Sequence, residues 1–190
     1  MSGAWLFVAG ALLGVALMVL PRAAAHLHTA WHVVHRGATT PVRAHTEEKF
    51  VFTANGPMER VASLFGADKE RVWAPGWNPQ FLHPLPAKDA EGMVFTVAHD
   101  HVRAAWVNTV FDPKNGRIQY VSVLPDVLVT VTTLQLTAQD GKTRVEVKYD
   151  RTALSKEADA HVRHLAEGDR ASGPDWEKQV DGYLASVDRQ

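Results

Sequence analysis

Histidines are the side chains in this sequence whose spacing most directly suggests chemistry. His28, His32 and His35 are four and three residues apart, which would place three imidazoles on one face of a helix, where they could hold a metal ion such as zinc. His99 and His101 would both point to one side of a strand, as an acid and a base or as two metal ligands. A polar connector and a solvent-facing strand end explain the two sets without a metal. We therefore expect neither a metal nor a cofactor.

Aromatic side chains form a second set of candidates, suited to contacts with an apolar ligand. Several of them flank a loop broken by Pro75 and Gly76, where they could stack on a planar or acyl group. Others occur in segments that are typical of strands and could line a cavity, with the phenol groups as sparse polar anchors. Packing within the core is the alternative for each of them. The predicted ligand-binding residues are Trp73, Trp77, Phe81, Trp106, Tyr120 and Tyr149.

Composition and absent motifs exclude several classes of protein. The 20 lysine and arginine residues nearly balance the 21 aspartate and glutamate residues, so no overall positive field attracts nucleic acid. The chain has no cysteine, which excludes disulfides, thiolate zinc sites and cysteine nucleophiles. It also lacks the motifs G-x-S-x-G, G-x-x-x-x-G-K-[ST], G-x-G-x-x-G and H-E-x-x-H. Hydrolase, P-loop, dinucleotide-binding and zincin functions therefore have no support.

The N-terminal residues 1–25 are expected to insert into a membrane, because residues 4–20 are apolar or glycine throughout. As an uncleaved single helix, the segment would anchor the protein, and the arginines that follow it would hold the rest of the chain in the cytoplasm. Alternatively, the stretch Ala23-Ala24-Ala25 resembles a signal-peptide cleavage site, and the mature protein would be exported. Residues 26–43 form a histidine-rich connector, and residues 44–190 form the domain.

The first part of this domain alternates between strand and helix signals. Residues 48–54 are rich in Phe, Val and Thr and predict a strand. Two short helices are expected next, the first opened by Pro57 and the second capped by Asp68. From residue 92 to residue 152, β-branched and aromatic runs are separated by compact turns, which predicts consecutive antiparallel strands. The fold class is therefore α+β, with a curved antiparallel sheet.

The C-terminal part supplies the cover for this sheet. Residues 155–167 predict a helix, and a second, longer helix begins at Pro174. The longer helix has an apolar stripe that consists of Trp176, Val180, Tyr183, Leu184 and Val187. Because the two short helices would cover only part of the concave face, we expect a cavity between the sheet and the long helix.

Six segments in this order resemble one protein superfamily. They are VWAPGWNPQF at 72–81, GMVFT at 92–96, WVNTVFDP at 106–113, IQYVSV at 118–123, VKYDRTALS at 147–155 and WEKQVDGYL at 176–184. Together they resemble the SRPBCC superfamily, also described as START-like or birch-pollen-allergen-like, and within it bacterial proteins grouped with polyketide cyclases and dehydrases. The resemblance implies a helix-grip fold with a hydrophobic pocket, which different members use for lipid transfer, hormone binding, aromatic cyclisation or partner binding. It implies no shared catalytic motif.

The predicted function follows from the pocket and from the apolar N-terminus. We expect the protein to bind, sequester or transfer a hydrophobic small molecule or lipid at a membrane, without covalent chemistry. One alternative is an enzyme of the polyketide cyclase or dehydratase type, in which a histidine or tyrosine would move protons. The other is a protein-interaction module whose groove receives an apolar segment of a partner.

Overall fold

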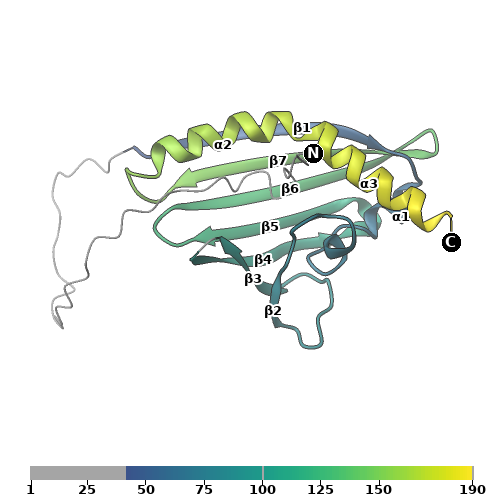
Figure 1. Cartoon of the computed structure of the whole chain (residues 1–190), viewed down its shortest axis with the longest axis horizontal. Helices are drawn as coiled ribbons and strands as arrows, with labels where there is room; N and C mark the ends of the chain where they lie inside the picture. Colours follow the sequence, from purple (N-terminus) through teal and green to yellow (C-terminus); the bar gives the residue numbers. More distant parts are fainter. Residues whose placement is uncertain (1–41, 100, 190) are drawn as a thin grey trace, which may run out of the picture.

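The computed structural model describes residues 42–99 and 101–189, and these form one curved antiparallel sheet with helices on one face (Figure 1). The elements are β1 (His45–Ala54), α1 (Met58–Ala62), the 3-10 helix η1 (Lys69–Val72), β2 (Gln80–His83), β3 (Val94–His99), β4 (Val102–Asp112), the 3-10 helix η2 (Pro113–Asn115), β5 (Arg117–Leu124), β6 (Leu128–Gln139), β7 (Lys142–Ala153), α2 (Asp159–Ala171) and α3 (Gly173–Val187). The predicted membrane segment and the predicted connector, except for its last residues Val42 and Arg43, lie outside the described residues. Among the described residues, no helix is both long enough and apolar enough to cross a bilayer.

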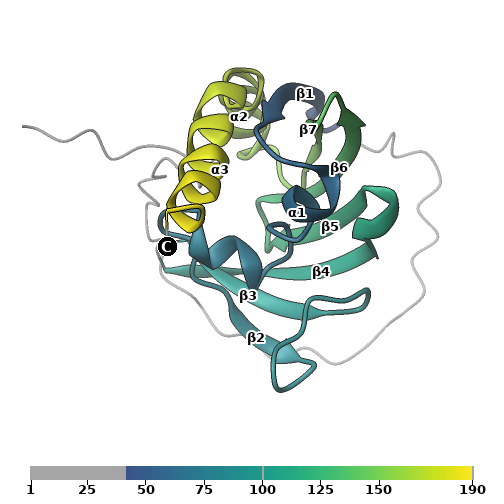
Figure 2. The same ribbon diagram turned by 90° about the vertical axis from the view of Figure 1, so that its right-hand side faces the viewer.

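The sheet holds the strands in the order β1-β7-β6-β5-β4-β3-β2, and each neighbouring pair is antiparallel. Strands that follow one another from β2 to β7 are therefore neighbours, as the compact turns in the sequence predict, and β1 joins the outer edge of β7. Figure 2 shows the sheet curving around α1 and the segment that follows it, with α2 and α3 along one side. This arrangement confirms the predicted helix-grip architecture.

The two faces of the sheet differ as the alternating strand patterns predict. In β7, the side chains of Val145 and Val147 are fully buried, whereas Arg144, Glu146 and Lys148 lie on the outer face. The same alternation settles the orientation of β4. Its residue Trp106 pairs with Phe95 of β3 and its ring stacks with that of Phe95, 5.8 Å between centroids, on the inner face. The flanking residues therefore point outward, and Ala105 is exposed.

The C-terminal helices cover the inner face, and the break between them falls where the sequence predicts it. Helix α2 ends at Ala171 and α3 starts at Gly173, with Pro174 in its first turn. The predicted stripe of α3 is buried at Trp176, Val180 and Leu184. Its remaining two residues are not core residues, since Tyr183 is half-buried and Val187 is 44% exposed.

Four local features differ from the sequence predictions. Helix α2 spans Asp159–Ala171 instead of the predicted residues 155–167. Strand β1 begins at His45, before the predicted start, because its first residues pair with β7 as far as Thr152. The second short helix is a 3-10 helix and spans only Lys69–Val72. The edge strand β2 was not predicted; it has four residues, three of which are exposed, so it lacks the hydrophobic alternation of a half-buried strand.

Candidate functional site

Aromatic side chains fill much of the space between the sheet and α3. The ring of Trp176 lies 5.4 Å from Phe50, 6.4 Å from Phe65 and 5.6 Å from Trp73, measured between centroids. The indole nitrogen of Trp73 donates a hydrogen bond to the carbonyl oxygen of Leu64 at 2.7 Å, and the side chain is 5% exposed. Trp73 is therefore part of the packed core, which leaves less room for a ligand than a bare concave sheet would.

A cavity of about 70 Å³ remains beside this cluster. Four of the six aromatic residues predicted from the sequence border it, together with Trp176 of α3. Its walls come from η1 and the segment after it, from β4 to β7 and from α3. The lining residues are Glu70, Ala74, Trp77, Trp106, Tyr120, Thr132, Leu134, Tyr149 and Trp176.

The aromatic walls of the cavity meet at steep angles. Trp77 and Trp106 are 5.6 Å apart with an interplanar angle of 87°, and Trp106 and Tyr120 are 6.3 Å apart at 73°. Edge-to-face contacts of this kind are a favourable arrangement for aromatic pairs. The indole nitrogen of Trp77 donates to the carbonyl oxygen of Ala67 at 2.8 Å, which holds that ring against the segment after α1.

Glu70 is the only residue with a carboxyl group among those that line the cavity, and it is 8% exposed. Its Oε1 atom accepts a hydrogen bond from the hydroxyl of Tyr120 at 2.9 Å and one from the backbone N–H of Gly66 at 3.3 Å. Within the described part of the chain, no hydrogen bond reaches its Oε2 atom. Glu70 therefore lines the cavity with one carboxylate oxygen that has no hydrogen-bond partner among the described residues.

Burial changes the acidity of this pair. Loss of solvation raises the pKa of Glu70 to about 7, although the hydrogen bonds from Tyr120 and Gly66 oppose the rise. Burial also raises the pKa of Tyr120 well above its ordinary value, and the neighbouring carboxyl of Glu70 adds to this effect. At neutral pH the tyrosine is therefore neutral, while Glu70 is divided between its neutral and charged forms. A carboxyl group in this range can exchange a proton with a bound molecule.

Two further polar atoms at the cavity have no hydrogen-bond partner in the described structure. They are the indole nitrogen of Trp106 and the hydroxyl oxygen of Thr132, both of which are buried. A buried polar group without a partner costs about 1 to 3 kcal/mol, so each is a place where a ligand or a water molecule would be stabilised. The indole nitrogen can only donate, which calls for an acceptor such as an oxygen.

A buried ion pair lies behind the ring of Tyr149. The guanidinium of Arg151 is bonded to both carboxylate oxygens of Asp169 at 2.7 and 2.8 Å, and it also donates to Thr130 at 2.9 Å. Its central carbon lies 4.5 Å from the centroid of the Tyr149 ring. Because Asp169 neutralises Arg151 directly, this pair fixes β7 to α2 and adds little net charge to the cavity.

The other residues predicted as site residues lie elsewhere. Phe81 is half-buried on β2, 6.3 Å from the ring of Phe95, and does not line the cavity. His99 is the last residue of β3, opposite Val102, and His101 is exposed in the turn that follows. The predicted histidine triplet His28, His32 and His35 lies outside the described residues.

Glu70 is the site residue that the sequence prediction missed. It lies in the charged run Asp68-Lys69-Glu70-Arg71, and residues of these types are mostly exposed in proteins. The available signal was its spacing, since Ala67, Trp73 and Ala74 are three and four residues away and would share one helical face with it. A carboxylate within an apolar stripe is an indication of a buried site.

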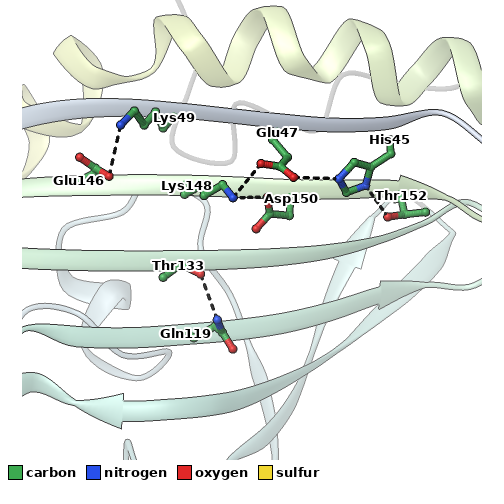
Figure 3. A network of polar contacts seen from close by, with 9 residues as sticks. All are labelled: His45, Glu47, Lys49, Gln119, Thr133, Glu146, Lys148, Asp150 and Thr152. Atoms are coloured by element: carbon green, nitrogen blue, oxygen red, sulfur yellow. Dashed lines mark hydrogen bonds and ion pairs between the residues drawn. The ribbon is translucent and has the colours of Figure 1, made fainter.

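A group that could hold a metal ion lies on the opposite, outer face of the sheet. The ligand atoms of His45, Glu47 and Asp150 all lie within 4.8 Å of one another. Figure 3 shows that the ammonium of Lys148 reaches into this group, 3.0 Å from Glu47 and 2.9 Å from Asp150. The hydrogen bond from Lys148 is the main reason why the pKa of Glu47 is lowered. The lysine therefore already supplies the positive charge that these carboxylates require.

A larger hollow, of about 320 Å³, lies between the end of α1, the start of η1, residues 87–89 and the end of β4. Its walls include Phe65 and Phe111, together with the charged residues Asp68, Lys69 and Asp89. The carboxylate of Asp89 accepts hydrogen bonds from the backbone N–H groups of Asp68 and Lys69 at 3.0 and 3.2 Å. Its acidic group thus serves to hold the start of η1, and the aromatic cavity remains the better candidate site.

Comparisons with known proteins identify the fold. No family model matches the sequence, and no curated protein matches it. Among solved structures, Ara h 8.0201 is 13% identical with a TM-score of 0.54, and the match covers 75% of this chain and 99% of that one. Norcoclaurine synthase from Thalictrum flavum is 8% identical with a TM-score of 0.59, covering 86% and 99%. A protein from Arthrobacter aurescens is 16% identical with a TM-score of 0.52, covering 74% and 86%.

These identities are low, so the likeness bears on the fold and leaves the activity open. The shared features are the seven-stranded curved antiparallel sheet, the short helices after the first strand and the C-terminal helix. The sequence motifs predicted the same architecture. The chain therefore has the helix-grip fold, as its sequence motifs predict.

Proposed function

We propose that the protein binds a small apolar molecule in the aromatic cavity and sequesters or transfers it. The observation that carries this proposal is a mainly aromatic cavity, two of whose lining residues, Trp106 and Thr132, each have a buried polar atom without a hydrogen-bond partner. Apolar burial would provide most of the driving force, at about 25 cal/mol per Å² removed from water. The polar atoms would fix the orientation of a ligand that carries an oxygen.

The size of the cavity narrows the ligand class. At about 70 Å³ it matches the liquid volume of roughly two water molecules, or a group of a few non-hydrogen atoms. This volume favours a small molecule, or the head of a larger one, over a complete lipid chain. The half-buried ring of Trp77 borders the cavity, so the remainder of a larger ligand would have to displace it or pass beside it.

The membrane setting is a further part of the proposal, and it rests on the sequence alone. Residues 4–20 are long enough and apolar enough to insert into a bilayer, which would place the domain next to a membrane. The test is fractionation of the full chain and of a chain that starts at Val42. We expect only the full chain to sediment with membranes, and equal sedimentation of both would contradict a role for the N-terminal segment.

An enzyme is the second candidate, because Glu70 and Tyr120 form a buried hydrogen-bonded pair at the cavity wall. A carboxyl group with a pKa of about 7 is suited to general acid or base catalysis at neutral pH. The predicted cyclase or dehydratase chemistry would therefore use Glu70 in place of the histidines His99 and His101. Product formation that depends on Glu70 would support this candidate over simple binding.

The cavity can be tested by filling it. Replacing Ala74, which lines the cavity, by methionine should reduce the affinity for butan-1-ol at least tenfold, because the larger side chain occupies the space. Replacing Ala105, which is exposed on the outer face, by methionine is the matched control and should leave the affinity unchanged. Nuclear magnetic resonance would follow the titration through the indole N–H signals, and thermal unfolding would verify that both variants fold.

The signal of the Trp106 indole gives a second, direct measure. Because this N–H has no partner in the structure, a bound alcohol oxygen should accept from it and shift its resonance. Trp106→Phe identifies the resonance. If butan-1-ol shifts no indole signal, or if Ala74→Met binds it as well as the unaltered protein does, the cavity is not the binding site.

A further inference from the structure

Five aromatic rings and one carboxyl group surround the cavity. The rings belong to Trp77, Trp106, Tyr120, Tyr149 and Trp176, and the carboxyl group belongs to Glu70. Aromatic faces carry a negative electrostatic potential, and they attract cations most strongly where water is excluded. A carboxylate adds a full negative charge to the same space. The combination therefore selects for positive charge as well as for apolar surface.

Glu70 dominates the charge of this cavity. Of the nine lining residues, the two tyrosines are held neutral by raised pKa values, and no other member is ionisable. Arg151, whose guanidinium lies 4.5 Å from the centroid of the Tyr149 ring, is bonded to both oxygens of Asp169 and is not among the lining residues. No lysine or arginine side chain is bonded to Glu70 in the described part of the chain. The carboxylate thus has hydrogen bonds but no counter-charge.

We propose that the ligand carries a protonated amine, whose ammonium group lies among the five rings and pairs with the Oε2 atom of Glu70. This inference rests on the proposed function, because it assigns the polar end of the molecule bound in the same cavity. A cavity of about 70 Å³ has room for an ammonium group and its first carbons. Thr132 has an unpartnered hydroxyl at the same wall, and it can accept a hydrogen bond from the ammonium.

The charge balance of Glu70 gives this proposal a measurable signature. Without a cation, burial favours the neutral carboxylic acid and its pKa is about 7. A bound ammonium favours the carboxylate, so an ammonium ligand must displace the proton. At pH 7 about half of the molecules hold that proton, and binding should release about half a proton per ligand. Affinity should rise about tenfold from pH 6 to pH 8, as the ionised fraction of Glu70 increases.

The groups that face Glu70 set the direction of this dependence. Tyr120 and the N–H of Gly66 donate to the charged form in both states, and neither titrates below pH 10. Asp89 is also negative and raises the pKa of Glu70 slightly. Asp89 therefore also favours binding of a cation, because the cation would relieve the repulsion between the two carboxylates. An alkylammonium remains protonated up to about pH 10, like a lysine side chain.

The test compares two ligands of equal size in the full chain, purified in detergent. Butylamine and butan-1-ol each have five non-hydrogen atoms, and only the amine is charged at neutral pH. We expect butylamine to bind at least tenfold more tightly at pH 8. Calorimetry at pH 7 in two buffers with different ionisation enthalpies counts the protons, and we expect release of about half a proton for the amine and none for the alcohol.

Glu70→Gln should remove both the preference for the amine and the proton release, because glutamine keeps the shape of the side chain without its charge. The matched control is Glu59→Gln, which changes an exposed carboxylate on α1 and should retain both. Equal binding of amine and alcohol, or amine binding without proton release, would overturn this inference and leave the proposed function standing. Binding of neither ligand would overturn the proposed function itself. The number of protons released is measured on the unaltered protein, so it tests the pairing of the amine with Glu70 even if Glu70→Gln does not fold.

Discussion

Replacing Glu70 by glutamine should change how the stability of the protein depends on pH. In the folded protein the carboxyl group has a pKa of about 7, whereas in the unfolded chain it returns to about 4.5. Below pH 4.5 both states hold the proton, and the native side chain is at its most favourable. As the pH rises toward and through 7, the unfolded state releases the proton first, so the folded state loses stability relative to it.

The size of this loss follows from the difference of about 2.5 pKa units. At about 1.36 kcal/mol per unit, the free energy of unfolding should fall by about 3 kcal/mol between pH 4.5 and pH 8 on account of this one group. Glutamine does not titrate, and its side-chain oxygen can still accept from Tyr120 and Gly66. The variant should therefore gain about 3 kcal/mol relative to the unaltered protein over that range.

Urea denaturation at pH 5, 6, 7 and 8, followed by tryptophan fluorescence, measures this difference directly. The comparison between variant and unaltered protein is essential, because other groups titrate in the same range. His161 has a pKa lowered by burial, which acts in the opposite direction, and it cancels in the difference. Glu59→Gln is the control and should parallel the unaltered protein. Parallel curves for Glu70→Gln would refute the claim that Glu70 is buried without a counter-charge.

Two further substitutions test the fold that holds the site. Val180→Asp would place an unpaired charge at a fully buried position of α3 and should lower the free energy of unfolding by several kcal/mol. Lys178→Asp, on the exposed face of the same helix, should lower it by less than about 0.5 kcal/mol. Thermal unfolding measures both changes. Gly116 has a positive φ of 69°, and in Gly116→Ala the added methyl group would lie only 2.2 Å from the carbonyl oxygen of Leu136. Gly141→Ala is the control, because φ is 77° there but no atom lies within 4 Å of the added methyl group. In urea unfolding Gly141→Ala should cost about 1 kcal/mol, and Gly116→Ala should cost well beyond that.

Much of the fold could be predicted because its signals are local and periodic. The alternation of Val145, Val147 and their charged neighbours fixes the two faces of β7, and the spacing of Val180 and Leu184 identifies the buried stripe of α3. Strand β2 could not be predicted in this way, because a short exposed edge strand is held by its pairing with β3 and carries no alternation of its own.

The site was only partly predictable, for a physical reason that Glu70 illustrates. The aromatic residues of the cavity are recognisable by type, and four of the six predicted residues do line it. Whether a given ring borders a cavity or fills the core depends on contacts between distant segments, as with Trp73 and Trp176. The same holds for the acidity of Glu70, which depends on burial under β5 and on the hydroxyl of Tyr120, 50 residues away.

The central claim is that a small ligand binds between the aromatic rings and Glu70. A crystal structure of the protein with 3-bromopropan-1-ol tests it most directly, because anomalous scattering locates the bromine without ambiguity. We expect bromine within the cavity bordered by Trp106 and Tyr149, and the alcohol oxygen within hydrogen-bonding distance of the indole nitrogen of Trp106 or the hydroxyl of Thr132. Bromine found only in the larger hollow beside Phe111, or nowhere on the protein, would contradict the claim.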